Sequence, residues 1–85
     1  MAKLIKRIVP VYPAMARQIR VSGTVKLLGI ITKDGRIREL KVLSGHPLLR
    51  PAALAAVSQW IYIPTTLGDQ AVEVEAPIDV IFELR

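Results

Sequence analysis

The sequence predicts one α+β domain, in which a three-stranded antiparallel sheet packs against two helices that lie mainly on one of its faces. Three observations predict it. Two strand-like stretches, 24–32 and 36–43, flank an Asp34-Gly35 turn, and Asp-Gly between such runs is a strong hairpin signal. Residues 72–84 alternate apolar and polar side chains, which is the period of a strand. Helix-favouring segments precede and follow the hairpin, so the expected order is α-β-β-α-β, and 85 residues suit one domain.

Residues 1–11 are expected to form an extended lead-in, and residues 12–85 the domain itself. Pro10 and Pro13 exclude a continuous helix through Tyr12, because proline removes a backbone donor and restricts the residue before it. Pro13 suits the first position of a helix, where a missing N–H costs nothing. A short helix is therefore expected from Pro13 to Ile19.

The predicted hairpin has two irregular features. Strand 24–32 is apolar on both faces, as expected of a central strand, and Gly29 within it predicts a bulge or a close approach. In the returning strand the apolar positions shift from odd, at Ile37, to even, at Leu40 and Val42. This change of phase predicts a β-bulge near Arg38-Glu39.

A second helix is expected from Pro51 to about Trp60. Ala53, Leu54, Val57 and Trp60 recur at helical spacing and would form its apolar face, which assigns structural roles to Leu54 and Val57. Pro64 stops any continuation, and a turn is expected at residues 67–69 before the last strand.

The last strand is the most informative stretch of the chain. Its even positions from Val72 to Leu84 are all apolar, whereas its odd positions are mostly acidic, so one face is expected on a core and the other in water. Pro77 cannot donate to a ladder and predicts a break or an unpaired position. The part of the strand available for pairing is therefore residues 78–84. If one of its edges is left unpaired at the end of the sheet, the N–H and C=O groups of that edge can bond another chain.

The charge is unevenly distributed along the chain. The net charge is +5, but residues 1–68 hold eleven basic residues against Asp34 and Glu39, whereas residues 69–85 are acidic. A basic body suggests an acidic partner, a membrane surface or nucleic acid. The basic residues are dispersed, however, and Trp60 and Phe82 lie on predicted core faces rather than on a basic surface. No nucleic acid partner is expected, since single strands stack on grouped aromatic side chains.

No constellation of residues predicts catalysis, a metal site or a cofactor. The chain has no cysteine, and His46 is its only histidine, so neither a nucleophile–base pair nor a ligand set can form around it. Acidic residues two apart on a strand are about 6–7 Å apart, which resembles a glycosidase spacing, but nothing else in the sequence builds a pocket. No apolar run reaches the ~18 residues that cross a bilayer, and residues 1–10 lack the apolar region of a signal peptide, so this chain alone is expected to be neither anchored nor exported.

Five short elements occur in an order that resembles a known family. They are Tyr12-Pro13-x-x-Ala16-Arg17, Gly23-x-Val25, Asp34-Gly35, Val42-Leu43-Ser44-Gly45-His46-Pro47-Leu48-Leu49 before an Ala-rich helix, and Trp60-x-Tyr62-x-Pro64. No single element is specific, but the ordered set resembles the C-terminal domain of TonB-type energy transducers, from about Pro10 to Leu84.

The resemblance implies a non-enzymatic adaptor. Such proteins have an inner-membrane anchor, a Pro-rich spacer and this domain in the periplasm, where it binds a short segment of an outer-membrane receptor as an added β-strand and supports energised uptake. The receptor-binding residues carried over by position are Ile78, Asp79, Val80, Ile81, Phe82, Glu83 and Leu84, with Tyr12 and Pro13 near the receptor-facing side. Trp60 and Tyr62 match the family's aromatic pair and are expected to be structural, as is Gly35 of the turn.

The sequence departs from the family at two points, and the departures leave an alternative. The anchor and spacer are missing, so contact with a membrane is expected only through an anchor outside this chain, and the chain is a fragment, an engineered sequence or a stand-alone relative. Ile61 and Ile63 replace basic or polar residues, which a second packed layer or a dimer contact would explain. The alternative function is a homodimerisation or strand-swapping module that uses the last strand's edge or Ile61 and Ile63.

Overall fold

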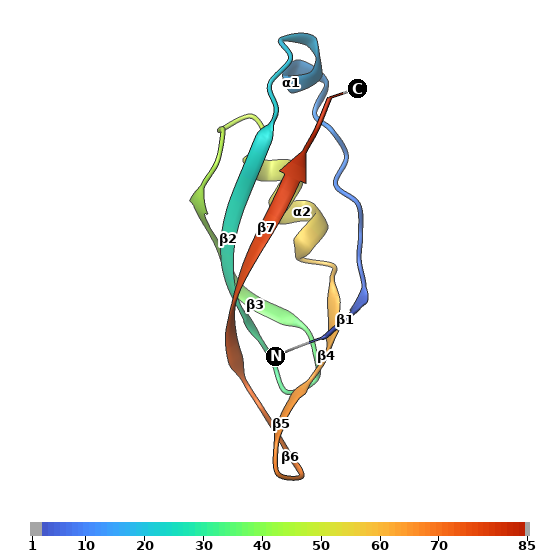
Figure 1. Cartoon of the computed structure of the whole chain (residues 1–85), viewed down its shortest axis with the longest axis vertical. Helices are drawn as coiled ribbons and strands as arrows, with labels where there is room; N and C mark the ends of the chain where they lie inside the picture. The colour runs from blue at the N-terminus through green and yellow to red at the C-terminus, as the bar shows by residue number, and fades with distance from the viewer. Residues whose placement is uncertain (1–2, 85) are drawn as a thin grey trace.

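The computed structural model describes residues 3–84 and is elongated, with principal extents of 49 × 21 × 16 Å (Figure 1). In chain order its elements are β1 (Lys3–Lys6), α1 (Ala14–Gln18), β2 (Gly23–Ile31), β3 (Ile37–Ser44), α2 (Arg50–Val57), β4 (Ile61–Ile63), β5 (Thr65–Leu67), β6 (Gln70–Val72) and β7 (Val74–Phe82). The predicted α+β class, with two helices and a three-stranded antiparallel sheet, is confirmed.

The main sheet has the order β3-β2-β7, and both pairings are antiparallel. The central strand β2 buries Val25, Leu27 and Ile31, because alternate side chains of a strand point to one face. The turn between β2 and β3 is closed by the N–H of Gly35, which donates to the carbonyl of Thr32 at 3.0 Å. Gly35 has φ of +85°, a conformation that favours glycine.

The β-bulge predicted near Arg38-Glu39 is confirmed. The register between β2 and β3 shifts between Leu28 and Ile30, and Glu39 adopts a positive φ of 52°. Gly29 lies opposite the bulge, where a Cβ would come within 2.9 Å of the Ile37 side chain. The close approach expected at Gly29 is therefore present.

The prediction of one strand over residues 72–84 is wrong in its boundaries. Residues 70–72 form β6, which turns back to pair with β5 in a small hairpin, and β7 begins only at Val74. The tip of this hairpin is the predicted turn at 67–69, where Gly68 has φ of +66°. Alternation of apolar and polar residues does not distinguish one long strand from two successive strands that pair with different partners.

Of the two alternatives predicted at Pro77, a break or an unpaired position, the break is absent. Residues 74–82 of β7 pair with β2 without a register shift, and Pro77 lies opposite Leu28. A proline is tolerated in an edge strand when its nitrogen faces away from the neighbouring strand.

The first helix agrees closely with its prediction. It spans Ala14–Gln18, and Pro13 precedes it as the N-cap with an extended backbone rather than as its first residue. Ala16 is fully buried, so this short helix joins the core at one end of the molecule (Figure 1).

The second helix is shorter than predicted. It ends at Val57, and its buried face consists of Ala53, Ala56 and Val57, whereas Leu54 is only half-buried. Trp60 follows the helix and enters the core from the connection to β4. The prediction placed Leu54 and Trp60 on one continuous face because it extended the helix to Trp60.

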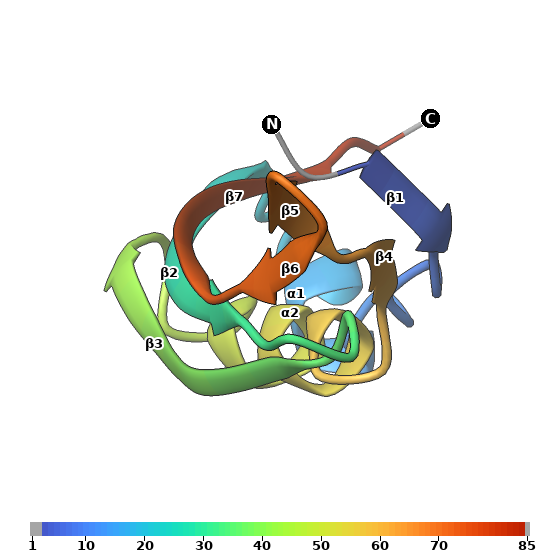
Figure 2. The ribbon, with the colours of Figure 1, turned by 90° about the horizontal axis from the view of Figure 1, so that it is seen from below.

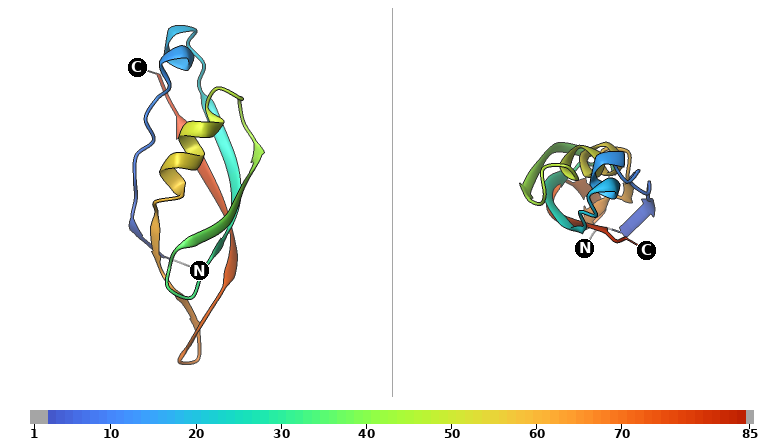
Figure 3. Two further views of the ribbon diagram at one scale, coloured as in Figure 1. Left: turned by 180° about the vertical axis from the view of Figure 1, so that it is seen from behind. Right: turned by 90° about the horizontal axis from the view of Figure 1, so that it is seen from above.

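The sheet curls around α2 (Figure 2). Views from behind and from above show α2 on the concave side of the sheet, with α1 at the far end (Figure 3). The core comprises Ala16, Val25, Leu27, Leu49, Ala53, Val57, Trp60, Ile78, Val80 and Phe82.

The lead-in contains a strand that the sequence did not predict. Residues of β1 pair with β4, with Lys3 opposite Ile63 and Leu4 opposite Tyr62. The indole Nε1 of Trp60 donates a hydrogen bond of 2.9 Å to the carbonyl oxygen of Ile8, which fastens the next part of the lead-in. The apolar segment 61–63 therefore pairs with a strand of its own chain. The domain boundary at residue 12 stays a prediction.

Candidate protein-binding edge

Strand β7 forms one edge of the main sheet. Among residues 3–84, only β2 pairs with it, in a ladder of nine consecutive residue pairs without a register shift. Figure 1 shows β7 beside β2, and on the side that faces away from β2 no other strand of residues 3–84 pairs with it. Such an edge is a template for pairing with another chain.

The opposite edge of the sheet, β3, is less suitable for pairing. Its ladder with β2 contains two register shifts, and Glu39 has a positive φ that disrupts the extended backbone. Arg38 and Glu39 form an ion pair of 2.9 Å on it. Bulges and charges of this kind are features that protect edge strands from pairing, so β7 is the open edge.

The orientation of the free backbone groups follows from Pro77. Since proline has no N–H, its uninterrupted pairing opposite Leu28 requires its nitrogen to face away from β2. Backbone groups alternate in direction along a strand, so those of Asp79 and Ile81 also face outward. Glu83 follows in the same alternation, beyond the last residue of β7.

The side chains of the predicted binding residues divide between core and solvent. Ile78, Val80 and Phe82 are buried, whereas Ile81 is 61% exposed and Asp79 is exposed. The even residues are therefore core residues, and β7 offers a partner its odd side chains and its outer backbone. Beyond β7, Glu83 is exposed and Leu84 is half-buried.

Tyr12 and Pro13, the other predicted binding residues, lie at the end of β7. The rings of Tyr12 and Phe82 meet edge to face, with centroids 5.5 Å apart and planes at 90°. The Tyr12 hydroxyl donates to the carbonyl of Val21, and the Arg17 guanidinium lies 5.4 Å from the centre of the Tyr12 ring. The carbonyl of Pro13 accepts the N–H of Arg17 in the first helical turn.

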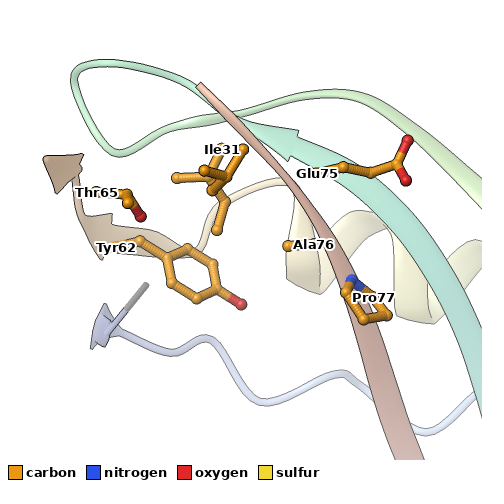
Figure 4. A pocket seen from close by; sticks show the side chains of 7 residues that line it. Ile31, Tyr62, Thr65, Glu75, Ala76 and Pro77 are labelled. Atoms are coloured by element: carbon orange, nitrogen blue, oxygen red, sulfur yellow. The ribbon is translucent and has the colours of Figure 1, made fainter. Parts of the chain in front are cut away.

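Two hollows lie along β7. The upper groove, about 400 Å³, lies between the end of β7 and the lead-in and is lined by Arg7, Val9, Pro10, Tyr12, Ile81, Phe82 and Glu83. The Tyr62 pocket, about 450 Å³, lies beside the start of β7 and is lined by Ile31, Tyr62, Thr65, Val74, Glu75, Ala76 and Pro77 (Figure 4). Both hollows are lined by consecutive residues of β7.

The predicted structural residues lie in the core, against it or at the hairpin turn. Trp60 is buried, and the Tyr62 N–H donates to the carbonyl of Gly35 at 2.8 Å, which ties β4 to the hairpin turn. Burial raises the pKa of the Tyr62 hydroxyl above its ordinary value of 10.0. Leu54 and Val57 pack in or against the core.

An ion pair that the sequence did not predict joins β3 to the residue before β7. Arg38 donates two hydrogen bonds to Glu73, from Nε at 3.1 Å and from a terminal nitrogen at 2.5 Å. The Arg38 guanidinium holds the pKa of Glu73 below its ordinary value of 4.5. The two residues are 35 positions apart, and no sequence spacing connects them.

Residues 3–84 contain no group of three His, Asp or Glu side chains placed to hold a metal ion. His46 lies in the connection before α2, where its Nδ1 accepts the N–H of Leu48 at 3.1 Å. The same part of the chain contains no helix that is both long and apolar enough to cross a membrane.

These features define a small α+β domain with one regular, unpaired sheet edge. Comparison with known proteins assigns it to a family. The profile described as "Gram-negative bacterial TonB protein C-terminal" matches residues 9–84, and the chain belongs to this family.

Individual relatives agree with the family assignment. The chain is 34% identical to a protein TonB of Pseudomonas aeruginosa over 89% of the present chain. It is 38% identical to tonB2 of the same organism over 82% of the present chain. It spans 23% and 27% of the lengths of those two proteins. The solution structure of the Pseudomonas aeruginosa TonB C-terminal domain matches with a TM-score of 0.77 and 34% identity, covering 98% of this chain and 86% of that one.

Proposed function

We propose that this domain is the receptor-binding end of a TonB-type energy transducer, and that it captures an extended segment of an outer-membrane receptor by strand addition to β7. The observation that carries the proposal is the regular unpaired edge of β7. In strand addition, main-chain hydrogen bonds give affinity and side-chain pockets give specificity. In this assignment the domain is non-enzymatic and works in the periplasm, with the membrane anchor supplied outside this chain.

The binding residues act mainly through their backbones. Asp79, Ile81 and Glu83 supply the outward N–H and C=O groups, and Ile81 adds an exposed apolar side chain. The buried side chains of Val80 and Phe82 fix the strand to the core. A partner strand that lies along β7 is loaded in shear when pulled along its axis, so its bonds break together, which suits the transmission of force.

The charge near the end of the edge favours a partner with acidic residues. Arg7 lines the upper groove, and Arg17 and Arg20 line a neighbouring hollow with Tyr12. Glu83 is the one acidic residue in the two linings, so the arginines outnumber it. Oppositely charged surfaces accelerate association and help to fix the register. We therefore infer that an acidic residue of the partner lies near this end of β7.

A second copy of the chain is the alternative partner. The exposed side chains of Ile81 and Ile63 favour it, because an edge strand with an apolar side chain can pair with its own copy. Sedimentation of the isolated domain distinguishes the two: a monomer throughout the micromolar range excludes the dimer, whereas a dimer that receptor peptides do not dissociate favours it.

The proposal is tested by titrating the ¹⁵N-labelled chain with synthetic peptides copied from the periplasmic N-terminal segments of outer-membrane receptors. Amide resonances of residues 78–84 are expected to shift. Absence of shifts there at peptide concentrations near one millimolar would contradict the proposal.

A proline variant separates edge pairing from other contacts. Ile81→Pro removes an outward N–H at a position of the same alternation as Pro77, so the ladder with β2 is expected to survive. Ile81→Ala is the matched control, because it loses the side chain and keeps the N–H. Peptide binding is expected to weaken far more in I81P than in I81A, and equal effects would point to side-chain contacts alone.

A further inference from the structure

We propose that the Tyr62 pocket receives a bulky apolar side chain of the strand that adds to β7, and that it thereby selects among partner segments. This inference rests on the proposed function, because the occupant is part of the same added strand. The pocket would be a specificity subsite beyond the seven residues that the sequence predicted as the binding edge.

The pocket lies beside the edge of β7 rather than over one of its faces. Its lining includes the consecutive residues 74–77, whose side chains point alternately to both faces of the strand. The opposite wall is formed by Tyr62 and Thr65, from β4 and β5 (Figure 4). In Figure 4, Tyr62 and Thr65 lie on one side of β7 and β2 lies on the other, so this wall stands on the side where a partner strand would lie.

The pocket begins where main-chain pairing must stop. Pro77 faces outward without an N–H, so a partner strand that pairs with Asp79 and Ile81 finds no backbone donor when it reaches Pro77. Pro77 and Ala76 form part of the pocket lining at this point. Side-chain capture can therefore replace backbone pairing as the source of affinity at this end of the edge.

The chemistry of the lining indicates what the pocket accepts. Ile31, Val74, Ala76 and Pro77 give it apolar walls, and its volume of about 450 Å³ has room for a large side chain such as Leu, Met or Phe. A partner strand that passes Pro77 carries such a side chain directly into this space. The occupant is therefore a residue tethered to the added strand.

One polar atom of the lining also lacks a partner. The Thr65 Oγ1 is buried and, among the described residues, has no hydrogen-bond partner. A buried hydroxyl without a partner costs free energy, and that cost is relieved when a polar atom of a bound segment reaches it. The backbone of the partner residue that fills the pocket supplies such atoms.

The test begins with the receptor peptide that shifts residues 78–84 most strongly in the titration above. Each of its residues is replaced in turn by glycine, and the dissociation constants are measured with the full chain. Replacement of one bulky apolar residue of the peptide is expected to weaken binding roughly tenfold. This residue lies just beyond the stretch that pairs with β7, at the Pro77 end.

A pocket-filling variant makes the assignment specific. In Ala76→Leu the added side chain occupies the pocket, so the same glycine replacement is expected to change binding less than about twofold. Ala71→Leu, on β6 and outside the pocket lining, is the matched control and is expected to keep the full tenfold effect. This comparison is a double-mutant cycle between protein and peptide, which isolates their direct coupling.

The outcomes separate the two proposals. No shifts at residues 78–84 with any peptide would overturn the proposed function, and this inference with it. If residues 78–84 shift but no peptide residue is sensitive to glycine, the pocket assignment is overturned and edge pairing stays intact. The same holds if the glycine effect is not coupled to Ala76→Leu. Intermolecular contacts between the sensitive peptide residue and the Tyr62 ring support the pocket directly.

A second variant does not depend on the fold tolerating a larger side chain. Thr65→Val keeps the shape of the side chain and removes the unpartnered hydroxyl, so the Tm of the free protein is expected to rise by roughly 4–8 °C. Peptide binding is expected to weaken at least twofold, which a purely structural role would not cause. Thr66→Val, at the next and exposed position, is the control. Equal affinities of T65V and the unaltered chain would overturn the role of the hydroxyl.

Discussion

The Tyr12 ring stands edge-on to the Phe82 ring, with centroids 5.5 Å apart. This contact joins Tyr12, two residues before α1, to the last residue of β7. The two positions are 70 residues apart, and both were predicted to belong to one site. Phe82 is buried, and the Tyr12 hydroxyl is fixed by its hydrogen bond to the carbonyl of Val21. The end of the proposed binding edge is therefore held by the start of the domain.

Two variants of Tyr12 separate the contribution of its hydrogen bond from that of its ring contact. Tyr12→Phe removes only the hydrogen bond to Val21 and is expected to lower the free energy of unfolding by about 1 kcal/mol. Tyr12→Leu also removes the edge-to-face ring contact and is expected to cost about 0.5–1.5 kcal/mol more. Urea denaturation followed by circular dichroism measures both. Equal losses in the two variants would show that the ring contact contributes nothing.

Replacement of Trp60 tests how the lead-in is held. Trp60→Phe keeps an aromatic ring in the core but removes the donor to the Ile8 carbonyl, so a loss of about 1–3 kcal/mol is expected. Backbone amides of β1 are expected to exchange with deuterium faster, because the next part of the lead-in is no longer fastened. Unchanged exchange in β1 would indicate that its pairing with β4 suffices.

Gly35 and Gly68 provide a matched pair of turn glycines. Both have positive φ, of +85° and +66°. A Cβ on Gly35 would overlap the carbonyl oxygen of Tyr62, whereas a Cβ on Gly68 would meet nothing within 4 Å. Gly68→Ala is expected to cost about 1–2 kcal/mol from backbone conformation alone. Gly35→Ala is expected to exceed about 4 kcal/mol.

Thermal and urea unfolding of both variants give the comparison between the two glycines. Similar stabilities of G35A and G68A would contradict the close approach of β4 to the hairpin turn.

The ion pair between Arg38 and Glu73 predicts a specific pH dependence. The pKa of Glu73 is lower in the folded chain than its ordinary value of 4.5, so the unfolded chain binds the proton more readily. The resulting stability is present above about pH 4.5 and is lost as the pH falls through the lower folded value. The pKa of Asp34 is lowered too, mainly by the hydrogen bond from Thr32, and contributes in the same direction from its ordinary value of 3.8.

The measurement is the free energy of unfolding between about pH 6 and pH 3. Glu73→Gln is expected to reduce the fall of this free energy at acid pH. Arg38→Gln removes the same pair and is expected to reduce the fall as well, although Glu73 keeps its weaker attraction to Lys33. A slope unchanged in E73Q would exclude the pair as a source of the acid dependence.

Much of this fold is predictable from the sequence, because several of its features depend only on neighbouring residues. The Asp34-Gly35 turn, the change of phase at Arg38-Glu39 and the proline before α1 each leave a signature within a few residues. The division of residues 70–82 into β6 and β7 does not, because both strands alternate alike and differ only in the strand with which each pairs.

The candidate site shows the same limit. Period-two alternation predicted the strand and its buried face. Which edge of β7 is unpaired depends on the sheet order, which is a long-range property. The outward direction of the backbone groups at the odd positions of β7 follows from the pairing of Pro77 with Leu28, which the sequence alone does not give. The Tyr62 pocket joins three separate parts of the chain, and no sequence signal connects them.

The central claim is that a receptor segment pairs with the outer edge of β7, and amide exchange at single residues tests it most directly. When a bound receptor peptide saturates the chain, the amides of Asp79, Ile81 and Glu83 are expected to exchange much more slowly than in the free chain. Those of Ile78, Val80 and Phe82, which face β2, are expected to change little. Saturating peptide that leaves the exchange of Asp79, Ile81 and Glu83 unchanged would contradict the claim.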